Sequence, residues 1–101
     1  MIKGDRKQYD ALYQAILTLE NLEECRAFFE DLCTVSELRA MEQRFEVAML
    51  LKDGMIYNDI LERTGASSAT ISRVNRALNY GADGYQRVLP RVKNREKDEN
   101  L

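Results

Sequence analysis

The segment at about residues 57–79 constrains the fold more than any other, because it has the pattern of two short helices joined by a tight turn. Ile60 lies where the first helix needs an apolar anchor. Gly65 follows as a turn residue that adopts a positive φ without a Cβ clash. Ser67 stands where the second helix needs an N-cap. The segment therefore predicts a helix-turn-helix.

The second helix of this motif is expected to have two chemically different sides. Ile71, Val74 and Leu78 recur at i, i+3 and i+7 and form one apolar stripe. No carboxylate occurs between Arg63 and Asp83, and the other side carries hydroxyl and guanidinium groups from Ser68, Ser72, Arg73 and Arg76. The helix dipole and the free N–H groups at a helix start attract phosphate. This side would therefore suit a groove of double-stranded DNA.

The turn and the polar side of the second helix supply the candidate DNA contacts. We predict that DNA is bound by Arg63, Ser67, Ser68, Ala69, Thr70, Ser72, Arg73 and Arg76. The hydroxyl groups could instead serve only as caps, and Arg63 and Arg76 could be solvated charges. For Arg73, the alternatives to a phosphate or base contact are an anion clasp shared with Arg44 and a charge facing water. Arg44 is better explained as the ion-pair partner of a nearby carboxylate.

The net charge of −2 argues against a uniformly basic surface, but the charges are unevenly distributed. Residues 1–62 contain 7 basic and 13 acidic side chains, a net charge of −6, whereas residues 63–101 contain 8 and 4, a net charge of +4. The basic half thus begins at the helix-turn-helix. Because a helical chain this short buries little surface alone, we also expect a partner that completes its core.

The residue inventory argues against an enzyme and against a metal protein. The chain has no histidine and only two cysteines, Cys25 and Cys33, which cannot supply a tetrahedral zinc site. We interpret both as small buried apolar residues in a reducing cytosol, in preference to a redox pair or disulfide. General acid–base chemistry would depend on scattered carboxylates, because no nucleophile stands beside an evident base. We therefore expect no enzymatic activity and no cofactor.

The sequence shows no signal for export or for membrane insertion. Residues 1–7 are polar for the most part, and no segment approaches the roughly 20 apolar residues of a membrane span. We therefore expect a cytoplasmic protein that associates with the nucleoid when it is bound to DNA.

Helical periodicity also extends over the part of the chain that precedes the motif. It predicts amphipathic helices over residues 5–19, 22–33 and 37–53, with Asn21 as the cap of the second. The third is the longest, begins at a capping box, Thr34-Val35-Ser36-Glu37, and is apolar on most sides of its last turns. A helix of this kind belongs at the centre of the fold.

The segment after the motif predicts one more helix and then a polar tail. Asp83 and Gln86 resemble a second capping box, and Pro90 should kink or truncate the helix that follows. The mixed charges of residues 94–101 predict a disordered tail. Since no segment has the period of a β-strand, we expect a single all-α domain over residues 1–93, with about six helices.

Three separated blocks of the chain resemble the Trp repressor family. They lie at residues 32–44, 50–54 and 65–81, and the similarity extends over about residues 10–93. Within the family the chain most resembles the YerC/YecD branch, whose signature is similar to Leu32-Cys33-Thr34-Val35, Thr64-Gly65-Ala66-Ser67 and Arg76-Ala77-Leu78-Asn79-Tyr80-Gly81. The resemblance implies an interlocked homodimer whose two helix-turn-helix units enter successive major grooves, about one helical turn apart as known for Trp repressor itself.

The same resemblance implies an effector pocket at Thr34, Arg44 and Arg73. Tryptophan-binding members of the family have a glycine beside the indole ring where this chain has Val74, and a serine where it has Ala77. Val74 would occupy the space of the ring, and Ala77 offers no hydrogen bond. We therefore expect that L-tryptophan is not the effector, and the sequence does not identify another small molecule in its place.

Three functional hypotheses follow from these observations. The first is a dimeric, sequence-specific transcriptional regulator, in particular a repressor. The second is a helical protein-interaction module that retains the motif without specific DNA binding and docks through its acidic first half. The third, an enzyme, has the least support in the residue inventory.

Overall fold

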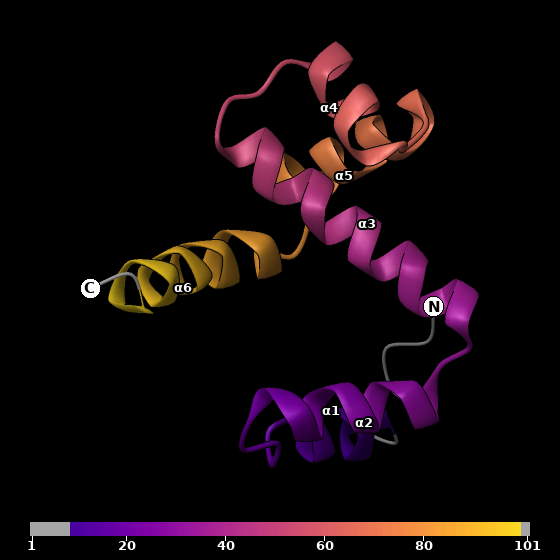
Figure 1. Ribbon diagram of the computed structural model, residues 1–101, viewed down its shortest axis with the longest axis vertical. Coiled ribbons are helices and arrows are strands. Elements are labelled where there is room, and N and C mark those ends of the chain that lie inside the picture. Colours follow the sequence, from indigo (N-terminus) through magenta and orange to yellow (C-terminus); the bar gives the residue numbers. More distant parts are fainter. Residues whose placement is uncertain (1–8, 100–101) are drawn as a thin grey trace. The chain divides into compact units, whose positions relative to one another are not determined.

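The computed structural model describes residues 9–99, which contain six α-helices and no β-strand (Figure 1). The helices are α1 (Asp10–Ile16), α2 (Leu22–Leu32), α3 (Val35–Lys52), α4 (Tyr57–Thr64), α5 (Ser68–Tyr80) and α6 (Gly84–Glu99). The predicted all-α class with about six helices is confirmed. None of these helices is long and apolar enough to cross a bilayer.

The chain divides into two compact units, one up to Leu38 and one from Arg39 onward. The first unit contains α1, α2 and the first turn of α3, and the second contains the remainder of α3 with α4, α5 and α6. The single domain predicted over residues 1–93 stays a prediction.

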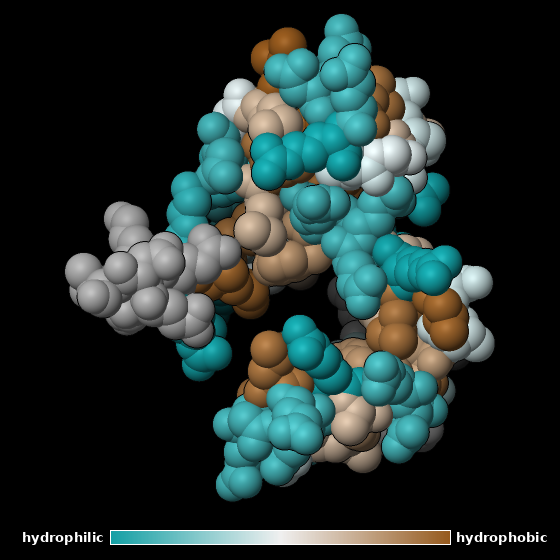
Figure 2. All heavy atoms as spheres, in the orientation of Figure 1, coloured by the Kyte–Doolittle hydropathy of each residue, from teal (hydrophilic) through white to brown (hydrophobic). Residues whose placement is uncertain are grey.

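The first unit contains no buried side chain in α1 or α2. Several of its large apolar side chains are exposed, and Figure 2 shows hydrophobic residues on the surface of this unit. The exposed ones are Tyr9, Leu12, Tyr13, Leu17, Leu22, Leu32 and Val35. The rings of Phe28 and Phe29 meet edge to face with their centroids 5.6 Å apart and are only half-buried. In α1 and α2, large apolar side chains are therefore left in contact with solvent.

Local capping determines where α2 and α3 begin, as the sequence predicts. The Asn21 side chain accepts a hydrogen bond from the Glu24 backbone N–H at 2.8 Å. In the predicted capping box, the Thr34 backbone N–H donates to the Glu37 carboxylate at 2.8 Å, and the Glu37 N–H donates to the Thr34 hydroxyl at 3.1 Å. Gly54, with a φ of 88°, follows α3 in the left-handed region. Both predicted caps are therefore confirmed.

The capping box predicts an acid-sensitive start of α3. The hydrogen bonds from Thr34, first its backbone N–H and then its side chain, hold the pKa of Glu37 below its ordinary value. A lowered folded-state pKa stabilises the folded chain above the ordinary pKa, and this stabilisation is lost as the pH falls through the folded value. A carboxyl-carbon NMR titration should show a low Glu37 midpoint that Thr34→Ala moves upward. An ordinary midpoint in the parent protein would contradict the contact.

The second unit has one apolar core to which all its helices contribute. The buried side chains are Val47 and Ala48 of α3, Ile60 of α4, Ala66 of the turn, Ile71, Val74 and Leu78 of α5, and Leu89 of α6. The stripe predicted on α5 is therefore confirmed. The C-terminal half of α3 also lies in this core, as its apolar residues on several sides predict.

Two predictions for the first unit need correction. The first helix ends at Ile16 and not at Leu19, because the backbone N–H groups of Thr18 and Leu19 donate to carbonyls three residues earlier, those of Ala15 and Ile16, which is a tighter turn than that of an α-helix. The start that the sequence predicts for it, at residues 5–8, lies outside the described residues. Cys25 and Cys33 are free thiols that are half-buried, and not buried as the sequence predicts.

Two predictions for the C-terminal segment also need correction. The helix α6 contains Pro90 and continues to Glu99, so residues 94–99 are helical and not disordered. Arg, Glu and Lys are good helix formers, and no glycine or further proline stops the helix there. Asp83 and Gln86 form no capping box, since Asp83 has a φ of 68° and the Gln86 amide donates to the Leu78 carbonyl. Residues 100 and 101 of the predicted tail lie outside the described part of the chain.

Candidate nucleic-acid interface

The turn between α4 and α5 is closed by Gly65 and Thr64. Gly65 has a φ of 72° and its N–H donates to the Leu61 carbonyl, which ends α4. The Thr64 hydroxyl donates to the Ile60 carbonyl at 2.7 Å and accepts from the Ala66 N–H at 3.1 Å. Ala66 is buried, so the turn itself packs against the core. As expected, no side chain caps the start of α4 at Ile56.

The start of α5 is capped by Ser67, as the sequence predicts. The Ser67 hydroxyl accepts from the Thr70 N–H at 3.1 Å and donates to the Thr70 hydroxyl at 3.1 Å. These two hydroxyl groups therefore satisfy each other locally, and Thr70 is half-buried. Ser67 is exposed, but its hydroxyl is engaged in the cap, whereas the exposed hydroxyl groups of Ser68 and Ser72 form no hydrogen bond with the described residues.

The exposed side of α5 lies opposite its buried stripe. We call it the α5 outer face; its residues, all exposed, are Ser68, Ala69, Ser72, Arg73 and Arg76. Ser68, Ser72 and Arg76 are spaced four residues apart, and Ala69 and Arg73 directly follow the first two. This spacing places all five along one side of a helix. Arg63, in the last turn of α4, is exposed as well. The structure thus brings together on one helix most of the residues that we predict to contact DNA.

The guanidinium groups of Arg63, Arg73 and Arg76 form no ion pair with the described residues. For Arg73 and Arg76 the reason is local, because no acidic residue stands three or four positions away on α5. Both keep their charge available to an anion outside the chain. The first turn of α5 also contains no acidic residue, so nothing there offsets the positive end of the helix dipole.

The three residues of the predicted effector pocket are exposed. Thr34 belongs to the first unit, where its hydroxyl is part of the capping box. Arg44 forms no ion pair with the described residues, contrary to the interpretation favoured from sequence. Its neighbours at three and four positions are apolar, and Glu42 and Glu46 point to other sides of α3.

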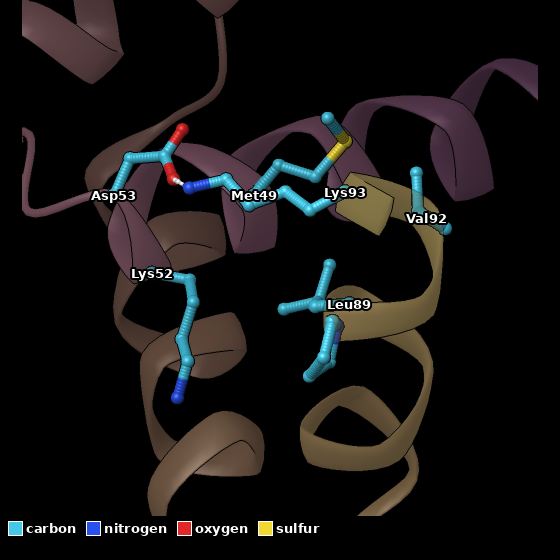
Figure 3. Close-up of a pocket in the computed structure, with 7 residues that line it drawn as sticks. Met49, Lys52, Asp53, Leu89, Val92 and Lys93 are labelled. Atoms are coloured by element: carbon cyan, nitrogen blue, oxygen red, sulfur yellow. Dashed lines mark ion pairs between the residues drawn. The ribbon is translucent and has the colours of Figure 1, made fainter. Parts of the chain in front are cut away.

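A pocket of about 250 Å³ lies between the C-terminal end of α3 and the middle of α6 (Figure 3). It is lined by Met49, Lys52, Asp53, Leu89, Pro90, Val92 and Lys93. Figure 3 shows the ion pair between Asp53 and Lys93, with Lys52 extending away from it. None of the three predicted effector residues lines this pocket.

Two glutamines, Gln43 and Gln86, form contacts with the helix-turn-helix that the sequence analysis did not predict. The Gln43 side-chain amide of α3 donates to the Thr64 carbonyl at 3.2 Å. The Gln86 amide of α6 donates to the Leu78 carbonyl at 2.7 Å and accepts from the Lys52 ammonium at 2.8 Å. No sequence pattern signals these contacts, since each depends on how separate helices pack.

Two short helices joined at a left-handed glycine, the second with a buried apolar stripe and an exposed face of hydroxyl and guanidinium groups, define a helix-turn-helix protein. A family model described as Trp repressor protein matches residues 7–93. The chain therefore belongs to the Trp repressor family, as its resemblance predicts.

Individual relatives of this chain support its assignment to this family. It is 52% identical over 92 residues to the uncharacterized protein YerC of Bacillus subtilis, with 91% of this chain and 88% of that protein covered. It is similar to a TrpR-like protein from Eubacterium eligens, with a TM-score of 0.82, 55% identity, and 86% of this chain and 90% of that one covered. A candidate Trp repressor from Staphylococcus aureus gives a TM-score of 0.83 at 46% identity, with 92% and 96% covered.

Proposed function

We propose that this protein is a sequence-specific DNA-binding transcriptional regulator, a repressor, that reads the major groove as a homodimer through α4 and α5. The observation that carries the proposal is the α5 outer face, where two arginines that form no ion pair with the described residues follow the capped start of a helix. Arginine and short hydroxyl side chains are the usual donors to phosphates and base edges. Membership of a regulator family supports the same conclusion.

The homodimer in this proposal explains the exposed apolar residues of the first unit. Leu17 is 80% exposed and Leu22 is 64% exposed, although both are large and apolar. A second copy of the chain would remove such side chains from water, which favours association. Sedimentation equilibrium should therefore give about twice the chain mass of 11.7 kDa.

Binding to DNA is tested by selection from random duplexes followed by fluorescence anisotropy. A regulator should enrich one motif with approximate two-fold symmetry, and its affinity should fall steeply with added salt as phosphate counterions are displaced. Enrichment of no motif would instead favour a protein-interaction module that docks through its acidic part. That alternative is supported by the exposed acidic residues of α2, namely Glu23, Glu24, Glu30 and Asp31.

We expect that L-tryptophan does not act as the effector. Val74, where tryptophan-binding relatives have glycine, is 2% exposed and part of the core, so an indole ring would have to displace a packed side chain. Isothermal titration of the protein with L-tryptophan, alone and with its selected duplex, should give no binding heat. Micromolar binding would contradict the proposal and would place the ligand elsewhere.

A further inference from the structure

In each helix of the motif, a carbonyl group in the last turn accepts a hydrogen bond from a glutamine of a neighbouring helix. The last four carbonyls of an α-helix have no partner within the helix. Thr64 is the last residue of α4, and its carbonyl accepts from Gln43. Leu78 lies in the last turn of α5, and its carbonyl accepts from Gln86. The same chemical device thus fixes the C-terminal ends of both helices.

Lys52 and the Leu78 carbonyl fix the same orientation of the Gln86 amide from its two sides. An ammonium group only donates hydrogen bonds, so the atom of Gln86 that faces Lys52 has to be its carbonyl oxygen. The amide nitrogen must then face the Leu78 carbonyl, which only accepts. A flipped amide would place donor against donor and acceptor against acceptor. The chain Lys52–Gln86–Leu78 therefore joins α3, α6 and α5 in one defined geometry.

These contacts do not reach the α5 outer face. Leu78 is buried and lies beyond the last residue of that face, Arg76. The two glutamines can therefore affect DNA only through the position of α4 and α5. Reading a base edge requires side chains held to within fractions of an ångström, whereas non-specific attraction to phosphates does not.

We infer that Gln43 and Gln86, the latter oriented by Lys52, are positioning residues that set sequence discrimination by the helix-turn-helix. The inference rests on the proposed DNA-binding function. Loss of one glutamine amide should tilt or loosen a motif helix. Affinity for the selected duplex then falls, while affinity for a duplex of unrelated sequence stays the same.

The test compares Gln86→Met and Gln43→Met with the parent protein, because methionine keeps the length of the side chain without its amide. We expect each variant to bind the selected duplex about three- to tenfold more weakly, as for the loss of one hydrogen bond. Affinity for the unrelated duplex should change less than twofold. Leu89→Val is the control, since it lowers stability at a buried site of α6 but keeps the amide contacts.

A second comparison tests the orienting role of Lys52. Lys52→Met should reduce discrimination in the parent protein and have no further effect in the Gln86→Met background, because the two residues act through one contact. If the two substitutions had additive effects on discrimination, Lys52 would not act through Gln86. In the free protein, the Gln86 side-chain amide should exchange its protons with water more slowly than an exposed glutamine, and fast exchange would also contradict it.

The possible failures are distinguishable. A parent protein that discriminates between no duplexes overturns the proposed function and the inference together. If the parent protein distinguishes the selected from the unrelated duplex and both methionine variants distinguish them equally well, the inference is overturned but the proposed function is not. Equal loss of discrimination in Leu89→Val would also overturn it, because stability and not the amide contact would then set the reading geometry.

Discussion

Arg73→Ala is expected to weaken binding to the selected duplex by about 1–3 kcal/mol, or about 5- to 150-fold. Arg73 lies on the α5 outer face, is exposed and forms no ion pair with the described residues. A guanidinium group in this setting is free to donate two hydrogen bonds to a guanine edge or to a phosphate. Fluorescence anisotropy at one fixed salt concentration measures the change.

Arg39→Ala is the matched control for this substitution. Arg39 is also exposed and helical, but it belongs to α3, outside the motif. Its loss should change the affinity by less than twofold. Comparing the two duplexes shows whether Arg73 contacts a base or a phosphate. Loss of a base contact lowers only the affinity for the selected duplex, whereas loss of a phosphate contact lowers the affinity for both duplexes. Unchanged affinity for both duplexes would remove Arg73 from the interface.

Ile60→Ala is expected to lower the free energy of unfolding by about 2–5 kcal/mol. Ile60 is fully buried among the side chains of the second unit's core, so its truncation removes apolar contacts and leaves a cavity. Urea denaturation followed by circular dichroism measures the loss. Parent and variant must be compared at one protein concentration, because the stability of a dimer depends on it.

Ile56→Ala makes the same chemical change four residues earlier. Ile56 is 63% exposed and precedes α4, so we expect a change within about 0.5 kcal/mol, as for a typical surface substitution. If both variants lost the same stability, the core assigned to the second unit would be wrong. A small effect at Ile60 with a large one at Ile56 would instead show that the N-terminal end of α4 is covered in the assembled protein.

Short-range patterns in the sequence predicted the helices and the capped starts of α2, α3 and α5, because a cap depends on residues within one turn. The predicted end of α1 and the disorder predicted for residues 94–99 were wrong. The hydroxyl of Ser67 and the backbone freedom of Gly65 act on neighbouring backbone groups. The buried stripe of α5 follows from the period of the helix alone. The local prediction was wrong where a distant partner competed, as at Gln86, whose amide binds Leu78 and takes no part in a cap at Asp83.

The sequence by itself determined the elements of this protein and which side of α5 is polar, since both are set by contacts within a few residues. Only the tertiary structure decided how the motif helices are held. The Gln43 contact spans 21 positions and the Lys52 contact spans 34, and no local pattern predicts a contact that exists only after helices have packed.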